Sequence, residues 1–247
     1  MTRPPSDTDF GYERIRPDDK RARVRSLFDA VAPRYDLMND LLSLGLHRLW
    51  KRAAIERTGL RPGQRVLDVA AGTGDLARLL VRRLGAEAVL VDPSPDMLRR
   101  ARAALRNEGI LARCVCAAAE QLPFPDGSFD AVTVGFGLRN FTDRQAGLGE
   151  MARCLRPGGR LVILEFSHPT DPLLRRLYDS YSFELMPRLG EWVAGQGDAY
   201  RYLAESIRVH PPREELVRMM REAGLERCRW SDMSGGIVAI HWGVRRV

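Results

Sequence analysis

Short apolar runs alternate with longer helical repeats through the middle of the chain. Each run has about the length of one strand, and the segment after it has apolar residues at every third or fourth position. This alternation predicts an α/β fold, in which parallel strands form one sheet and helices cover both of its faces. The predicted strands cover residues 66–70, 88–92, 112–116, 129–134 and 160–165.

The alternation changes after residue 165. Residues 167–221 have leucine and aromatic side chains at helical spacing, which predicts a helical insertion. Two further strands follow near 226–232 and 236–242, and the short link Ser234-Gly-Gly236 between them indicates a hairpin. We therefore expect a seven-stranded sheet whose last strand is antiparallel. The insertion either packs on the core or forms an apolar substrate pocket with a basic contact to a membrane surface.

The chain before the first strand divides into two parts. Residues 1–22 are polar and contain prolines, which predicts a flexible N-terminal arm. Residues 23–58 have a helical pattern that Pro33 interrupts, and they include the very apolar stretch DLMNDLLSLGLHRLW. These helices either pack on the edge of the sheet or form a lid over a bound ligand. We expect residues 23–247 to form a single domain.

A glycine turn follows the first strand in the stretch VLDVAAGTGD. Gly72 and Gly74 allow backbone angles that other residues disfavour, and they let a ligand approach the main chain. Asp92 lies twenty residues beyond Gly72, at the end of the next strand, where a carboxylate suits the two hydroxyls of a ribose. The two signals together predict a nucleoside-bearing cofactor at the carboxyl ends of the strands.

The glycine turn leaves two cofactors open. The spacing Gly72-x-Gly74-x-x-Ala77 satisfies the dinucleotide fingerprint, so a nicotinamide-dependent oxidoreductase is one alternative. Asp68, inside the strand, and Asp75, beside the turn, argue against a pyrophosphate because both are negatively charged. They suit a cofactor with a cationic amino group and a sulfonium, such as S-adenosylmethionine. The simpler interpretation of Asp68 is that it caps a turn.

Further candidate residues follow the third and fourth strands. Ala118 and Ala119 are small enough for an adenine to lie against the backbone. Arg139 and Asn140 end the stretch VGFGLRN, at the edge of the sheet where the reacting centre is expected. C-methylation of an aromatic ring is favoured by a phenolate, which Arg139 would stabilise while Asn140 orients the ring or a water. Alternatively, Asn140 caps the following helix.

Composition and absent motifs narrow the class of protein. The formal net charge of +7 allows contact with nucleic acid or anionic lipid, and only Lys20 and Lys51 among the 39 basic residues are lysines. An N-P-P-[YF] motif and a Pro-Cys nucleophile do not occur at the end of the fourth strand. Their absence weakens the interpretation that the chain is a nucleic-acid methyltransferase. The cysteines and histidines show no metal-ligand spacing, so we expect no metal. The start MTRPPSDTDF has no apolar core, and no run approaches the ~20 apolar residues of a membrane span, which predicts a cytoplasmic protein.

The chain resembles the ubiquinone/menaquinone biosynthesis C-methyltransferase family from about Phe28 onward. The stretch Tyr35-Asp-Leu-Met-Asn39, FGLRN and YRYLAESI are the most family-specific matches. The other matching stretches are FDAVAPR, DLLSLGLHRLWK, VLDVAAGTGD, AEQLPFPDGSFDAVTVG, LRPGGRLVILEFS, YSFELMPRLG and GGIVAIHWG. The resemblance implies a class I S-adenosylmethionine-dependent methyltransferase with a Rossmann-like fold, which methylates a ring carbon of a polyprenylated quinol.

By motif position, the resemblance places the cofactor at Thr73, Asp92, Ala118 and Ala119. The chain departs from the family where members often have Asn, at Ala118, and where they often have Ser, at Gly135.

The sequence leaves several properties open, including the exact substrate and the group that accepts the proton. Demethylmenaquinol is the expected substrate, with a methoxy-benzoquinol as a second one. The alternative is a methyltransferase of the same fold that acts on another small molecule or on a lipid. We expect a water or Tyr35 to take the hydroxyl proton; His168, just after the fifth strand, is the nearest histidine to a strand end. A quinol with a long prenyl tail implies peripheral contact with a membrane surface. The sequence leaves the oligomeric state open, a homodimer included.

Overall fold

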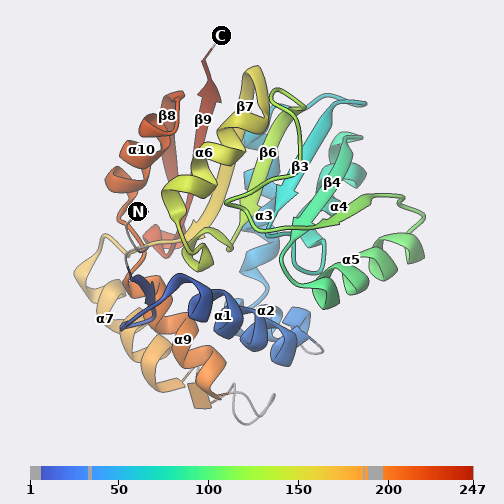
Figure 1. Ribbon diagram of the computed structural model, residues 1–247. Helices are drawn as coiled ribbons and strands as arrows, with labels where there is room; N and C mark the ends of the chain where they lie inside the picture. Colours follow the sequence, from blue (N-terminus) through green and yellow to red (C-terminus); the bar gives the residue numbers. More distant parts are fainter. Residues whose placement is uncertain (1–6, 33–34, 186, 189–196, 247) are drawn as a thin grey trace, which may run out of the picture.

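A seven-stranded mixed sheet with helices on both faces forms the centre of the protein (Figure 1). The computed structural model describes residues 7–32, 35–185, 187–188 and 197–246. The strand order is β5-β4-β3-β6-β7-β9-β8, and β9 is antiparallel to both neighbours. This confirms the predicted fold class. The strands are β3 (Arg65–Val69), β4 (Glu87–Asp92), β5 (Arg113–Cys116), β6 (Phe129–Gly135), β7 (Leu155–Phe166), β8 (Leu225–Met233) and β9 (Val238–Arg245).

The central strands are apolar because helices cover them from both sides. Their alternate residues belong to two separate cores. Leu67 of β3 packs in the core on the side of α6 and α10, whereas Val66 packs in the core on the side of α3, α4 and α5. The helices are α3 (Leu46–Arg57), α4 (Asp75–Leu84), α5 (Pro95–Asn107), α6 (Arg144–Cys154) and α10 (Arg213–Glu222).

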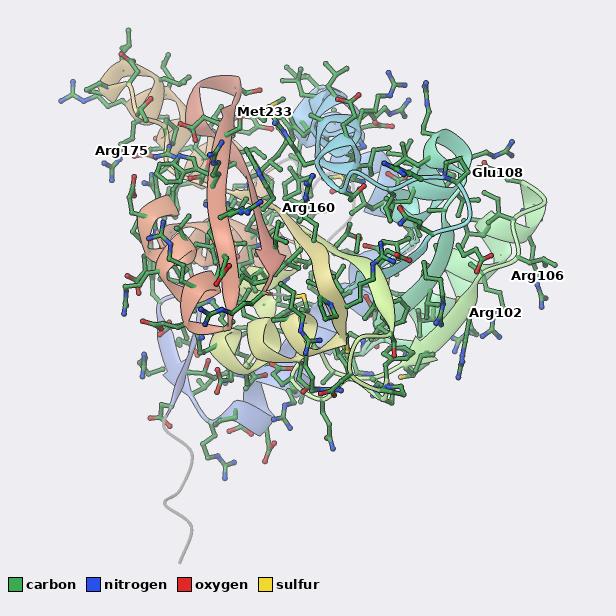
Figure 2. The ribbon with its side chains drawn as sticks, turned by 90° about the horizontal axis from the view of Figure 1, so that it is seen from above. Arg102, Arg106, Glu108, Arg160, Arg175 and Met233 are labelled. Carbon is green, nitrogen blue, oxygen red and sulfur yellow. The ribbon has the colours of Figure 1, made fainter. Side chains whose placement is uncertain are left out.

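The start of α5 has the residue types that favour a helix N-terminus. Ser94 is the N-cap, its hydroxyl accepts a hydrogen bond from the Met97 amide at 3.2 Å, and Pro95 occupies the first helical position. Arg102 and Arg106 extend from the outward side of the helix into solvent (Figure 2). The amphipathic pattern therefore determined both the first residue of this helix and the face that it buries.

The stretch Arg156-Pro-Gly-Gly159 lies inside β7. Strand β7 pairs with β6 from Leu155 onward, and the pairing register shifts between Phe129 and Ala131 of β6. The extra residues form a bulge in which Gly158 has a φ of +76°. The glycines thus bend the strand without ending it.

The N-terminal segment differs from the predicted arm. Residues 8–22 form a hairpin of β1 (Thr8–Phe10) and β2 (Glu13–Ile15), followed by the first turns of α1 (Pro17–Val31). Lys20 is only 1% exposed, and its Nζ donates to the Phe141 carbonyl at 2.8 Å. Phe10 stacks on the ring of Tyr202 at 4.4 Å. The prediction of a flexible arm was wrong for these residues. Polar side chains make many of their contacts, and such contacts leave little apolar periodicity in the sequence from which order could be predicted.

Helices from both ends of the chain gather where the parallel strands end (Figure 1). They include α1, α2 (Tyr35–Ser43), α7 (Pro172–Ser180) and α9 (Gly197–Arg208), with the π-helical turn η3 (Tyr181–Leu185) after α7. Val31, Met38 and Tyr200 form a small core that joins α1, α2 and α9. Helix α10, by contrast, packs on the sheet. The helices therefore enclose space beside the carboxyl ends of the strands.

Candidate active site

Two cavities meet beside the glycine turn. The larger has a volume of about 590 Å³ and lies under α2, α3, α7 and α9. The smaller has a volume of about 470 Å³ and lies between α1 and the ends of β4 and β5. Phe28, Ala70 and Gly72 line both cavities, so a ligand can extend from one into the other.

The two glycines of the turn have different tasks. Gly72 has a φ of +55°, and a Cβ built on it would meet nothing within 4 Å, so the space beside its backbone is open to a ligand. Gly74 has a φ of +82°, but its Cβ would lie 3.1 Å from the Ala101 Cβ and 3.2 Å from Leu90 Cδ2. The predicted cofactor residue Gly74 therefore provides close packing of the turn on α5 and β4, while Gly72 and Thr73 line the cavities.

Asp92 connects the glycine turn to the end of β4. Its Oδ2 accepts a hydrogen bond from the Gly72 amide at 2.9 Å, and its Oδ1 accepts one from the Ser94 amide at 2.9 Å. The side chain lines the smaller cavity and is nearly buried, and this burial raises the pKa of its carboxyl. Each carboxylate oxygen has a second lone pair, so two acceptor sites remain for a diol.

Ala118 and Ala119 lie where the sequence predicted them, beside Asp92 in the wall of the smaller cavity. Their small side chains leave space along the backbone after β5. Met97 and Phe28 also line this cavity. The cavity therefore combines a paired acceptor with a flat apolar wall, which suits a nucleoside.

Asp68 lies at the end of β3 in the wall of the larger cavity. It is 1% exposed, and its Oδ1 accepts a hydrogen bond from the Thr133 hydroxyl at 2.8 Å. Its Oδ2 makes no hydrogen bond of normal geometry among the described residues, although the nearby Ala77 amide favours the charged form. Burial raises the pKa of this carboxyl to about 7, although the Thr133 hydroxyl opposes the shift. A buried acceptor without a partner fits a ligand with a cationic amino group.

Lys51 and Asp75 complete this part of the larger cavity. Lys51 Nζ lies 2.6 Å from Asp75 Oδ2, and Arg78 pairs with the other carboxylate oxygen. Burial alone would raise the pKa of Asp75, but Lys51 and Arg78 hold it below its usual value. The sequence prediction missed Lys51. One signal was present: Lys51 and Lys20 are the only lysines of an arginine-rich chain, and both are buried.

Arg139 and Asn140 face different cavities, although they are neighbours in the chain. Both belong to the 3₁₀ turn η2 (Leu138–Asn140), in which successive side chains point about 120° apart. Arg139 lines the larger cavity, whereas Asn140 lines the smaller one. The Asn140 Oδ1 accepts a hydrogen bond from the Tyr202 hydroxyl at 3.0 Å. The structure therefore does not bring the two together on one side of a substrate ring.

Glu165 holds Arg139 in place. Its Oε1 lies 2.9 Å from Arg139 Nη1, and its Oε2 accepts a hydrogen bond from the Arg139 amide at 3.2 Å. Both side chains are almost completely buried, and the guanidinium lies over the Phe166 ring, 5.4 Å from its centroid. The Arg139 Nε has no hydrogen-bond partner within the described part of the chain. The sequence prediction missed Glu165, whose signal was an acidic residue inside the apolar strand LVILEF.

The structure bears differently on Tyr35, the predicted proton acceptor, and on His168, the histidine nearest to a strand end. Tyr35 is the first residue of α2, but its side chain lies outside the described residues. His168 Nε2 is 3.3 Å from the His210 carbonyl oxygen, and His168 is not among the described residues that line either cavity. Among the four histidines, His47 of α3 lines the larger cavity.

The larger cavity is mostly apolar, with leucines from α2, α3 and α7 in its wall. Several exposed leucines lie on the same elements. Leu44, between α2 and α3, is 86% exposed, and Leu173 and Leu177 of α7 are 67% and 61% exposed. The cavity thus adjoins an apolar surface, which we call the leucine surface: Leu41, Leu44, Leu46, Leu49, Leu173 and Leu177.

The sequence is similar to proteins of one family. The model of the ubiE/COQ5 methyltransferase family matches residues 16–245. The chain is 51% identical to the "Ubiquinone/menaquinone biosynthesis C-methyltransferase UbiE" of Edwardsiella ictaluri, over 98% of each chain. The protein of the same name from Proteus mirabilis is 50% identical over 96% of each chain.

Solved structures agree on the fold. A possible histamine N-methyltransferase from Thermotoga maritima, described as S-adenosylmethionine-dependent, superimposes with a TM-score of 0.60 at 23% identity, over 90% of this chain and 99% of that one. The [4+2]-cyclase SpnF superimposes with a TM-score of 0.68 at 20% identity, over 91% of this chain and 95% of that one. These likenesses concern the fold alone, since one fold supports several chemistries.

Proposed function

We propose a reaction for this chain on the basis of its family. The chain belongs to the ubiE/COQ5 methyltransferase family. It is an S-adenosylmethionine-dependent C-methyltransferase of ubiquinone/menaquinone biosynthesis, and its substrate is a quinol. We infer that it converts a polyprenylated demethylmenaquinol to menaquinol, with the methoxy-benzoquinol of ubiquinone synthesis as a second substrate. The main support is the similarity, 50–51% identity over nearly the full chain, to relatives named as C-methyltransferases of ubiquinone/menaquinone biosynthesis. The family assignment also decides against the nicotinamide alternative.

The residues of the two cavities fit S-adenosylmethionine. This co-substrate supplies a methyl group on a sulfonium, which is a good leaving group. Asp92 would accept hydrogen bonds from the ribose hydroxyls, and Ala118 and Ala119 would contact the adenine. In the larger cavity, the unpartnered Oδ2 of Asp68 would take the amino group, and Lys51 carries the charge that suits the carboxylate.

The quinol ring would then lie in the larger cavity, between the glycine turn and Arg139. The task of the protein is to hold a ring carbon in line with the methyl group and to raise the electron density on that carbon. Arg139 would favour the ionised hydroxyl because a cation lowers the pKa of a nearby phenol. We propose that the helices of residues 23–58 act as the lid, and that α7 and α9 of the segment 167–221 form the apolar wall around the prenyl tail, whereas α10 of that segment packs on the sheet.

A direct methylation assay tests this function. The purified chain is incubated under reducing conditions with S-adenosylmethionine and a short-chain demethylmenaquinol, and then with the matching methoxy-benzoquinol. We expect one methyl group in the quinol for each S-adenosylhomocysteine formed, measured by mass spectrometry. No methylated product from either quinol, with a cofactor that calorimetry shows to be bound, would exclude quinols as substrates.

The affinity for S-adenosylmethionine should depend on pH through Asp68. Burial raises the pKa of Asp68 to about 7, so below that pH a growing share of the carboxyl is protonated and cannot pair with the amino cation. We therefore expect the affinity to fall by up to about tenfold for each pH unit below 7. Asp68→Asn should bind more weakly, with an affinity that is nearly constant from pH 5.5 to 7. Calorimetry at several pH values measures both, and an unchanged pH dependence in Asp68→Asn would assign the titration to another group.

We propose that the chain is cytoplasmic and binds the membrane surface through the leucine surface. In the described part of the chain, no helix is both long and apolar enough to span a bilayer. A prenylated quinol is dissolved in lipid, and the cavity proposed for it adjoins the exposed leucines. Arg175 extends outward from α7 near these residues (Figure 2), where it can attract anionic lipid. A homodimer remains a prediction that sedimentation equilibrium can test.

Vesicle flotation tests the leucine surface. We expect the chain to float with anionic vesicles at low salt and to dissociate as salt rises, because screening weakens the arginine contacts. The double variant Leu44→Asp/Leu173→Asp should lose most of this binding. Leu111→Asp is the matched control: Leu111 is 89% exposed but precedes β5, at the opposite end of the sheet. Equal loss in the control, or no flotation of the wild type, would contradict the proposed surface.

A further inference from the structure

His47 combines a position in the wall of the larger cavity with a defined set of partners. It lies on α3, one turn before Lys51, and both residues line the cavity together with Asp68. It is 7% exposed, so the ring is largely shielded from bulk water. The other three histidines do not line either cavity. His47 is therefore the one imidazole placed to reach a ligand there.

The hydrogen bonds of Ser43 determine which ring nitrogen carries the proton. The Ser43 hydroxyl donates its single proton to the Asn39 carbonyl at 2.6 Å. The same oxygen lies 2.8 Å from His47 Nδ1, where it can only accept. Nδ1 therefore carries the hydrogen, and in the neutral ring Nε2 has the free lone pair. This tautomer is assigned from the hydrogen-bond pattern.

Charged groups on three helices surround the ring. Asp40 of α2 faces it, with Oδ1 at 3.7 Å from Nε2, while Arg48 and Lys51 lie on α3 and Asp75 lies on α4. Burial and Lys51 lower the pKa of His47, and Asp40 and Asp75 oppose the shift. The ring is thus neutral at pH 7, and Asp40 is placed to stabilise it once it takes up a proton.

We propose that His47 is the general base of the methyl transfer, which rests on the proposed function of quinol methylation. Its Nε2 takes the proton of the ring hydroxyl, so that an O–H bond breaks and an N–H bond forms. The electron pair of the phenolate moves to the ring carbon, which bonds to the methyl group while the carbon–sulfur bond breaks and leaves its pair on sulfur. The methylated carbon then loses its hydrogen as a proton, and the C–H electron pair restores the aromatic ring as a phenolate. The phenolate oxygen takes back the proton held on His47, so one net proton is released for each methyl group transferred.

The other titratable groups of the cavity are less suited to this task. Burial raises the pKa of both Tyr178 and Tyr202 to about 12, so neither side chain is ionised at neutral pH. Asp75 is occupied by Lys51 and Arg78. Asp68 is required by the proposed amino group of the cofactor. The imidazole of His47 thus remains, among the described side chains of the cavity, as the base with a free lone pair.

The first test replaces His47 by glutamine, whose amide can still donate to Ser43. Turnover at saturating S-adenosylmethionine should fall by about 10²-fold, a typical loss for one general base. Affinity for S-adenosylmethionine, measured by calorimetry, should stay within about threefold, which also shows that the variant is folded. His168→Gln is the matched control and should keep wild-type turnover.

The second measurement separates a catalytic role from a structural one. At saturating S-adenosylmethionine, which removes the effect of Asp68 on cofactor binding, kcat/KM of the wild type for the quinol should fall on the acid side below pH 6.5, because protonation of the His47 ring removes the base. His47→Gln should lack this fall, and added imidazole should restore part of the turnover of His47→Ala. Turnover of His47→Gln within threefold of the wild type from pH 5.5 to 8, or an unchanged acid limb, overturns the proposal. A wild-type chain that methylates no quinol overturns the proposed function as well.

Discussion

Arg139→Ala should lower turnover on the order of 10²-fold and should also destabilise the fold by about 3–5 kcal/mol. The loss of turnover is expected because the guanidinium lines the cavity and favours the ionised quinol hydroxyl. The loss of stability is expected because Glu165 is 1% exposed and would remain as a buried charge without its partner. Affinity for S-adenosylmethionine should change little. Single-turnover methylation and denaturant unfolding measure the two effects.

A double variant separates the two roles of Arg139. Replacing a buried ion pair by neutral side chains of similar volume is often close to neutral for stability. Arg139→Met/Glu165→Gln should therefore regain much of the stability, although glutamine keeps one oxygen and can accept only one of the two backbone amides, of residues 139 and 166, that now donate to separate carboxylate oxygens. Turnover should remain low. If turnover recovers together with stability, Arg139 is a structural residue and the phenolate role is wrong.

Arg99→Ala is the control for removing an arginine from an ion pair. Arg99 pairs with Asp96 on the surface of α5, and its side chain is 69% exposed. Exposed pairs contribute little because water screens them. Stability and turnover of Arg99→Ala should therefore match those of the wild type.

Asp92→Ala should weaken binding of S-adenosylmethionine by at least about tenfold, because each charge-assisted hydrogen bond to the ribose contributes about 1.5–3 kcal/mol. The structure adds a second cause. The carboxylate also accepts the Gly72 and Ser94 amides, so its removal leaves the glycine turn without an anchor. Both causes act in the same direction, and calorimetry measures their sum.

Asp92→Asn helps to separate these causes. Asparagine keeps one oxygen that can accept a backbone amide but loses the charge, so its affinity should lie between those of the wild type and Asp92→Ala. Asp96→Ala, on the exposed start of α5, is the control and should bind like the wild type. An unchanged affinity in Asp92→Ala would remove Asp92 from the cofactor site.

The sheet and the position of its ligand-binding edge could be predicted from the sequence because both depend on local patterns. Apolar runs and helical repeats report which residues are buried, so the five parallel strands and the terminal hairpin were recognisable. Parallel strands all end at the same edge, so Asp68, Gly72, Asp92 and Ala118 had to lie near each other once their strands were assigned. No long-range contact was needed for this part of the site.

Only the tertiary structure decided how the polar side chains are paired. Arg139 and Asn140 are adjacent in sequence, yet a 3₁₀ turn directs them into different cavities, and Glu165 comes from the next strand to hold Arg139. Lys51 and His47 reach the site from a helix that the pattern identified only as amphipathic. Hydrophobic periodicity predicts which apolar faces are buried. It does not predict which group pairs with a buried polar side chain.

The N-terminal segment of residues 8–22, which contains the hairpin and the first turns of α1, shows the same limit most clearly. Its residues look like a flexible arm because they are polar, but Lys20 is buried by a hydrogen bond to the carbonyl of Phe141, a residue 121 positions away. A buried ammonium is tolerated only where acceptors are already in place. The sequence determined which segments form the sheet and where a cofactor can bind, whereas the partners of the buried charges were decided when distant segments packed together.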